Sequence, residues 1–125
     1  MLAGPFSSGV TTGGAGTSTN NQTSSVILEG MVAAIYVKYN DSPPAGTADV
    51  TVATLGTSPN APALTLLSKA NAATDGWFFP RAVEHLNSDG SALTSHTYLP
   101  IMDKVKVTLA QANDGDSVDV WILTI

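Results

Sequence analysis

The sequence DKVKVTLAQANDGDSVDVWILTI, residues 103–125, has the most regular pattern in the chain. In its first part Val105, Val107 and Leu109 alternate with polar side chains, which is the period of a strand with one buried face. Its second part alternates in the same way. Between the two parts, NDGD at residues 113–116 supplies Asn, Asp and Gly, which tolerate the positive φ of a tight turn. The pattern predicts two strands joined as a hairpin.

Three other segments extend this pattern toward the start of the chain. SVILEGMVAAIYVKY, residues 25–39, is apolar almost throughout and predicts one long strand, or two strands with a break at Gly30. ADVTVATL, residues 48–55, alternates as a half-buried strand does, whereas ALTLLSKANA, residues 63–72, fits either a strand or a short helix. No long amphipathic helix interrupts these segments. We therefore expect an all-β fold, a single antiparallel sandwich or barrel of about seven or eight strands.

The composition excludes several classes of protein. Charged residues make up 12% of the chain and the net charge is −5 without a basic patch, which argues against a nucleic-acid partner. Cys is absent, so disulfides, thiol nucleophiles and Cys-based metal sites are excluded. No apolar run approaches the roughly 20 residues that a membrane span needs, and the first residues do not resemble a secretory signal. We expect no membrane partner.

Residues 1–25 contain five Gly, five Ser and five Thr and no charged side chain. Ordering a backbone costs roughly 1–2 kcal/mol per residue, more than Leu2, Phe6 and Val10 recover by burial. One interpretation is a tail without fixed structure. We instead expect an extended N-terminal arm that a neighbouring subunit holds through backbone hydrogen bonds and these three anchors, followed by a β-sandwich domain over residues 26–125.

The segment TDGWFFPRAVEHL, residues 74–86, places three of the eight aromatic residues side by side. Consecutive strand residues point to opposite faces, and a sandwich core accepts only one of them. Two interpretations follow for Phe78. Either a bulge or loop turns it back into the core, or it lies against another chain, where aromatic residues and Arg are enriched.

For Arg81 and Trp121 too, the partner lies either within the fold or on another chain. Arg81 is one of five basic residues, and its partner is either Asp75 or Asp103 within the fold, or a group on another molecule. Trp121 lies on the face of the last strand that begins polar and ends apolar. A soluble monomer seldom leaves such a stripe in water, so the N-terminal arm, a loop or a partner is expected to cover it.

The residues that carry chemistry are few. His85 and His96 are the only histidines, and no nucleophile, phosphate-loop or zinc-protease motif is present. Asp114, Asp116 and Asp119 could offer oxygens to calcium but lack the spacing of a calcium loop, so a turn is favoured. We therefore expect no catalytic residue, no metal and no cofactor, and a protein that is not an enzyme.

The order DGWFFPRAVEHLNSDGS…YLPIMDKVKVTLAQANDGDSVDVWILTI resembles small proteins encoded by tailed bacteriophages. In both, an aromatic-Pro-Arg element precedes a turn, a strand with the pattern of residues 103–110, a Gly-Asp turn and a terminal strand of the form VxVWhL. The resemblance covers roughly residues 30–125. These proteins are similar to head decoration (cement) proteins.

The resemblance implies a jelly-roll-like β-sandwich and a structural role in the virion. It implies assembly in the host cytoplasm and binding to the major capsid protein on the outside of the shell, where the protein clamps neighbouring subunits. A homo-oligomer is expected, with a trimer as the first guess.

The alternative is a carbohydrate-binding or adhesive sandwich on a virion or tail, which an exposed Trp77 or Trp121 beside a polar groove would favour. The residues expected to contact partners are Leu2, Phe6, Val10, Phe78, Arg81 and Trp121.

Overall fold

The computed structural model describes residues 1–40, 44–56, 62–71 and 74–125. Within these residues the regular structure consists of strands, and there is no helix that could cross a membrane. The strands are β1 (Leu2–Ser7), β2 (Ser18–Thr23), β3 (Leu28–Tyr39), β4 (Asp49–Thr54), β5 (Thr65–Lys69), β6 (Gly76–Phe78), β7 (Ala82–His85), β8 (Ala92–Thr97), β9 (Leu99–Asp103), β10 (Val105–Ala112) and β11 (Val118–Thr124).

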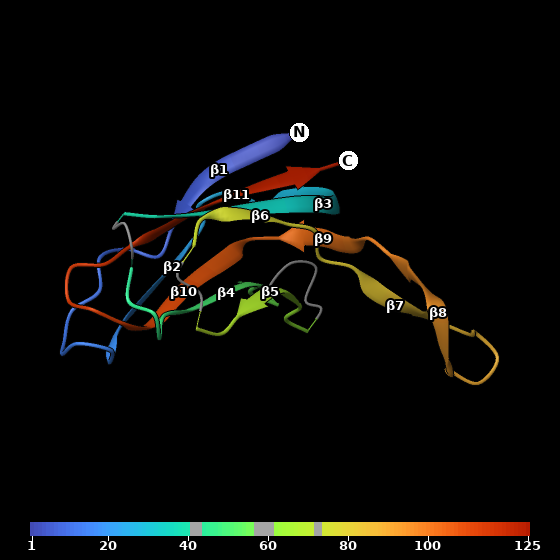
Figure 1. The fold of residues 1–125 in the computed structure, drawn as a ribbon. Coiled ribbons are helices and arrows are strands. Elements are labelled where there is room, and N and C mark those ends of the chain that lie inside the picture. The colour runs from blue at the N-terminus through green and yellow to red at the C-terminus, as the bar shows by residue number, and fades with distance from the viewer. Residues whose placement is uncertain (41–43, 57–61, 72–73) are drawn as a thin grey trace.

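Two packed sheets form the body of the molecule (Figure 1). One has the order β1-β11-β3-β6, with β9 also paired to β3, and the other has the order β2-β10-β4-β5. The antiparallel pairs are nested along the chain: β1 with β11, β2 with β10, β3 with β6 and β4 with β5. This is the connectivity of a long hairpin rolled into two sheets, a jelly roll. The predicted antiparallel β-sandwich is confirmed, and its topology is that of a jelly roll.

The core lies between the two sheets and consists mainly of β-branched residues and leucines. The alternation predicted for the last two strands is confirmed, since the inward residues of β10 and β11 are fully buried and the residues between them are not. Each such aliphatic side chain contributes about 1.5–3 kcal/mol when it is fully buried. The largest fully buried side chains are Ile35, Leu109, Ile122, Val32, Val37, Val50, Val52, Val105, Val107, Val118, Val120 and Thr11.

The predicted hairpin between the last two strands is wrong, because β10 and β11 belong to different sheets. Residues 113–116 do turn, but they carry the chain from one sheet to the other. Thr11 binds this turn: its amide donates to the Asp116 carbonyl at 2.8 Å, and its hydroxyl donates to the Asn113 carbonyl at 2.7 Å. The amide of Gly115 donates in return to the Thr11 carbonyl at 2.8 Å. A turn signal does not specify which strands the flanking segments pair with.

The N-terminal segment is part of the sandwich, which corrects the expectation of an arm outside a domain that starts at residue 26. Strand β1 forms an edge of one sheet beside β11, and β2 forms an edge of the other beside β10. Phe6 packs against the core. The estimate from apolar burial failed because an edge strand also gains order from backbone hydrogen bonds to its neighbour, and polar residues form these equally well.

Two ambiguous segments are settled by pairing. Residues 25–39 contain one long strand, β3, and Gly30 lies within it instead of breaking it. Its φ of 129° suits glycine, and a Cβ there would come within 3.1 Å of the Ile125 carbonyl oxygen. Residues 63–72 contain strand β5, whose two leucines are buried against the core, so the helix alternative is wrong.

The connection from β6 to β10 adds β7, β8 and β9 to the jelly roll. Strand β9 pairs with the first part of β3 and so extends that sheet. Strands β7 and β8 pair with each other, and within the described part of the chain they have no other strand partner. Their hairpin projects from one end of the sandwich (Figure 1), and every residue of β8 is exposed. Isolated two-stranded hairpins are marginally stable in water.

We expect deletion of residues 1–24 to abolish cooperative folding of the free chain. The deletion removes β1 and β2 together, exposes one edge of β11 and of β10, and removes Thr11 from the turn that links them. Thermal unfolding followed by circular dichroism measures the effect, and Val10→Ser, at a position that is 59% exposed, is the control. A truncated chain that melts at the same temperature would contradict this role.

The stability of the fold is expected to fall at alkaline pH through Tyr39. Burial, followed by the charges of Asp75 and Asp49, raises the pKa of Tyr39 to about 12. Tyrosine ionises near pH 10 in an unfolded chain, so between about pH 10 and 12 the unfolded state loses its proton first and the free energy of unfolding falls, by about 3 kcal/mol. Below about pH 10 this contribution is fully present.

Urea denaturation at intervals between about pH 9 and pH 12 measures this dependence. Tyr39→Phe should remove it and leave stability at neutral pH unchanged or higher, because the buried hydroxyl has no hydrogen-bond partner among the described residues. Tyr98→Phe, at an exposed position, should retain it. If the Tyr39→Phe variant loses as much stability at alkaline pH as the wild-type chain, groups other than Tyr39 cause the loss.

Candidate functional site

Strand β6 divides the aromatic run between the two sides of its sheet. Phe78 packs against the core, and the Lys69 ammonium lies 4.5 Å from its ring centroid. Trp77 and Phe79 point outward and are 49% and 64% exposed. Strand alternation therefore directs Phe78 to the core side, without the bulge or loop that one interpretation required, and the contact of Phe78 with another chain stays a prediction. The aromatic residues with a free face are its two neighbours.

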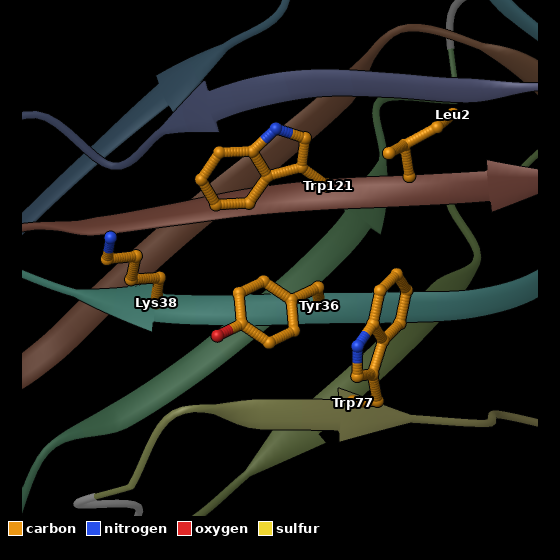
Figure 2. A pocket seen from close by; sticks show the side chains of 5 residues that line it. All are labelled: Leu2, Tyr36, Lys38, Trp77 and Trp121. Atoms are coloured by element: carbon orange, nitrogen blue, oxygen red, sulfur yellow. The ribbon is translucent and has the colours of Figure 1, made fainter.

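Three aromatic residues on adjacent strands form one row on the outer face of the β1-β11-β3-β6 sheet. Trp121 of β11 lies opposite Tyr36 of β3, and Tyr36 lies opposite Trp77 of β6. The ring centroids are 5.8 Å apart for Trp121 and Tyr36 and 5.1 Å apart for Tyr36 and Trp77. The ring planes are tilted by 53° and 50° in these pairs. We call these three residues the aromatic ladder (Figure 2).

The aromatic ladder lines a shallow hollow with a volume of about 270 Å³, together with Leu2 and Lys38 (Figure 2). Strand β1 forms one border of this hollow. It passes so close to Trp121 that a Cβ at Gly4 would lie 3.2 Å from Cδ1 of the indole and 2.7 Å from the Val120 carbonyl oxygen. Glycine at this position, with a φ of 129°, permits the approach. The N-terminal segment thus helps to cover the Trp121 stripe, one of the three options that we considered.

Arg81 anchors the projecting hairpin to the sandwich. Its Nη1 donates to the carbonyl oxygens of Ala33 at 3.0 Å and Pro80 at 2.7 Å, and its guanidinium carbon lies 4.2 Å from the Tyr98 ring centroid. The contacts found for Arg81 are thus with backbone carbonyls and an aromatic ring, whereas the two predicted alternatives were a carboxylate within the fold and a group on another molecule. Asp75, one candidate, accepts a hydrogen bond from a backbone amide of β3.

The other candidate carboxylate, Asp103, also binds backbone amides. Its side chain accepts hydrogen bonds from Gly56 at 2.7 Å and from Lys104 at 2.7 Å. Asp103 is buried at the end of β9, so these bonds fix the junction between β9 and β10. Each of the two predicted carboxylates therefore stabilises a strand end.

The remaining residues that we expected to contact a partner lie in different places. Leu2 and Trp121 come together at the hollow. Phe6 and Phe78 pack against the core and are engaged in the fold itself. Val10 is 59% exposed in the loop after β1. The structure therefore brings two of these residues into one site and leaves Val10 apart from it.

The sequence did not single out Tyr36 and Lys38, although both line the hollow. The available signal was the alternation within β3, where every second residue from Tyr36 onward faces outward. The almost continuous apolar run over residues 25–39 concealed this alternation, because both faces of the strand read as buried.

The polar residues weighed for catalysis or metal binding do not assemble. His85 and His96 lie on the projecting hairpin at exposed positions that do not pair with each other. Asp114 accepts a hydrogen bond from the Gly13 amide and Asp116 from the Asn113 amide, so both belong to the turn structure. In the described ranges, no group of three or more His, Cys, Asp or Glu residues could hold a metal ion.

Comparisons of the chain with protein-family models, with curated proteins and with solved structures found no match.

We expect Arg81→Ala to loosen the hairpin without unfolding the sandwich. The substitution removes two hydrogen bonds and one cation–π contact at an exposed position, which together contribute about 1–2 kcal/mol. Hydrogen exchange of the amides in β7 and β8 should accelerate by about tenfold or more. The melting temperature of the sandwich should change little. His85→Ala on the same hairpin is the control, and unchanged exchange in Arg81→Ala would rule out the anchoring role.

Proposed function

We propose that the chain is a head decoration (cement) protein of a tailed bacteriophage, which binds the outside of the capsid and stabilises contacts between major capsid subunits. The sequence resemblance over roughly residues 30–125 supports this function. It implied a jelly-roll-like sandwich, and the chain has that topology. Jelly rolls occur in viral capsid and lectin domains, so the specific support comes from the surface of this chain.

The observation that carries the proposal is the projecting β7–β8 hairpin. It extends beyond the sandwich (Figure 1), and Val83, Leu86 and Leu93 on it are 40%, 44% and 38% exposed. A two-stranded ribbon with exposed apolar residues does not bury them against itself. Its open strand edges and apolar side chains suit contact with a second protein, both by strand addition and by apolar packing.

In this proposal the hairpin binds the major capsid protein, and the sandwich remains on the outer surface of the virion. The chain assembles with the shell in the host cytoplasm. A homo-oligomer fits this role, since copies related by rotation bind equivalent capsid subunits at one symmetry axis, and a trimer is the first arrangement to test.

Purified chain mixed with empty phage heads that lack this protein provides the test, by co-sedimentation and by the disruption temperature of the heads. The wild-type chain should bind saturably and raise that temperature. The double variant Val83→Ser and Leu93→Ser should bind at least about tenfold more weakly, because it removes apolar area from the contact while the core is untouched.

The matched control is Val26→Ser with Ile27→Ser, two other exposed apolar residues, at 52% and 48% exposure. Both double variants should melt within a few degrees of the wild-type chain. If the hairpin variant binds heads as the wild type does, another surface makes the contact. If the wild-type chain does not bind heads at all, the decoration function is rejected.

A further inference from the structure

The hollow over the aromatic ladder is not used by the proposed contact of the hairpin with the capsid. We propose that this hollow is a binding site for a neutral oligosaccharide, which stacks on Trp77, Tyr36 and Trp121. The inference goes beyond the proposed function and does not require capsid binding, because the site lies within a single copy of the chain.

The arrangement of the three rings suits a sugar. A pyranose ring has C–H bonds on its flat face and hydroxyl groups around its edge, so it fits an aromatic face, whose π electrons attract C–H hydrogens, bordered by polar groups. The three side chains lie in a row across the adjacent strands (Figure 2), and the Tyr36 ring is tilted by 53° to Trp121 and by 50° to Trp77. The ladder therefore offers three separate inclined aromatic faces, on which one or two sugar rings can stack in turn.

Polar groups stand beside these aromatic faces. Figure 2 shows the indole nitrogens of Trp77 and Trp121, the Tyr36 hydroxyl and the Lys38 ammonium around the hollow. The indoles and the ammonium donate hydrogen bonds, and the tyrosine hydroxyl both donates and accepts. Sugar hydroxyls need partners of both kinds, and sites of this type combine an aromatic lining with a few polar groups that fix orientation.

Charge favours a neutral sugar over an acidic one. Lys38 is the charged residue of the lining. Asp119 lies directly opposite Lys38 in the pairing of β11 with β3. Opposite charges in facing positions of neighbouring strands attract one another. A carboxylate at the position facing Lys38 lowers the positive potential there, which favours a neutral sugar over one with a carboxylate or sulfate group.

The size of the hollow favours a small ligand over a protein. Its volume is about 270 Å³ and five residues line it. Stable protein interfaces involve about 20–30 residues on each side. An oligosaccharide can occupy such a shallow site with one or two of its rings while the rest of the molecule remains in solvent.

The test is an array of immobilised glycans that includes neutral gluco-, galacto- and N-acetylhexosamine oligosaccharides beside their sialylated and sulfated forms. The isolated chain should bind a neutral series saturably. Isothermal titration with the best neutral oligosaccharide should then give at least about tenfold weaker binding for Trp77→Ala, since one of three stacking faces is lost. Phe79→Ala is the matched control, because Phe79 is an exposed aromatic outside the ladder.

A second readout protects the test from misfolding of a variant. In the wild-type chain, bound sugar should shield tryptophan fluorescence from iodide quenching, and Tyr36→Phe should weaken binding while leaving the fold unchanged.

Absence of binding to every neutral glycan would overturn the inference, as would an equal loss of affinity in Trp77→Ala and Phe79→Ala. Self-association of the chain that Trp77→Ala abolishes would assign the aromatic ladder to an interface between copies. Failure of head binding with retained sugar binding rejects the proposed function alone.

Discussion

The pairing of the first strands of the chain with its last strands is the constraint on which the structure depends. Strand β1 lies beside β11 and β2 lies beside β10, so both ends of the chain contribute to both sheets. The turn between β10 and β11 is bound to Thr11, a buried residue of the N-terminal segment. Strand β2 (STNNQT) consists of polar residues, so backbone hydrogen bonds to β10 hold it in place, whereas β1 adds apolar packing of Phe6 against the core.

Two further pairings in the same sheet, β11 with β3 and β3 with β6, produce the aromatic ladder. Trp121, Tyr36 and Trp77 are far apart in the sequence, and they meet because β11, β3 and β6 are neighbours in one sheet. In β11, alternate residues point to opposite faces of the sheet. The same alternation therefore buries the valines of β11 in the core and directs Trp121 outward. The edge strand β1 then borders the site, and Gly4 permits its close approach to Trp121. A segment whose composition predicts no fixed structure thus helps to shape the hollow over the aromatic ladder.

The surface of the molecule offers two separate features for recognition. The hairpin of β7 and β8 projects from one end, is held at its base by Arg81, and has exposed apolar residues without a core of its own. The aromatic ladder lies on the sandwich itself. A rigid sandwich with a projecting ribbon can bind a large partner through the ribbon and a small ligand on the sheet, and the two proposed activities are separable by substitution.

The sequence by itself determined the strands over residues 48–55 and 103–125 and the inward side of each, because alternation is a local property that needs no knowledge of neighbours. It also indicated the all-β class. Only the tertiary structure decided which strands pair, and so it separated β10 from β11 and made residues 1–25 part of the sandwich. The candidate site depends on the same strand pairing, because Tyr36 becomes part of the aromatic ladder only when Trp121 and Trp77 lie on the adjacent strands. Strand pairing is a contact between distant segments, and the alternation of one segment does not specify its partner.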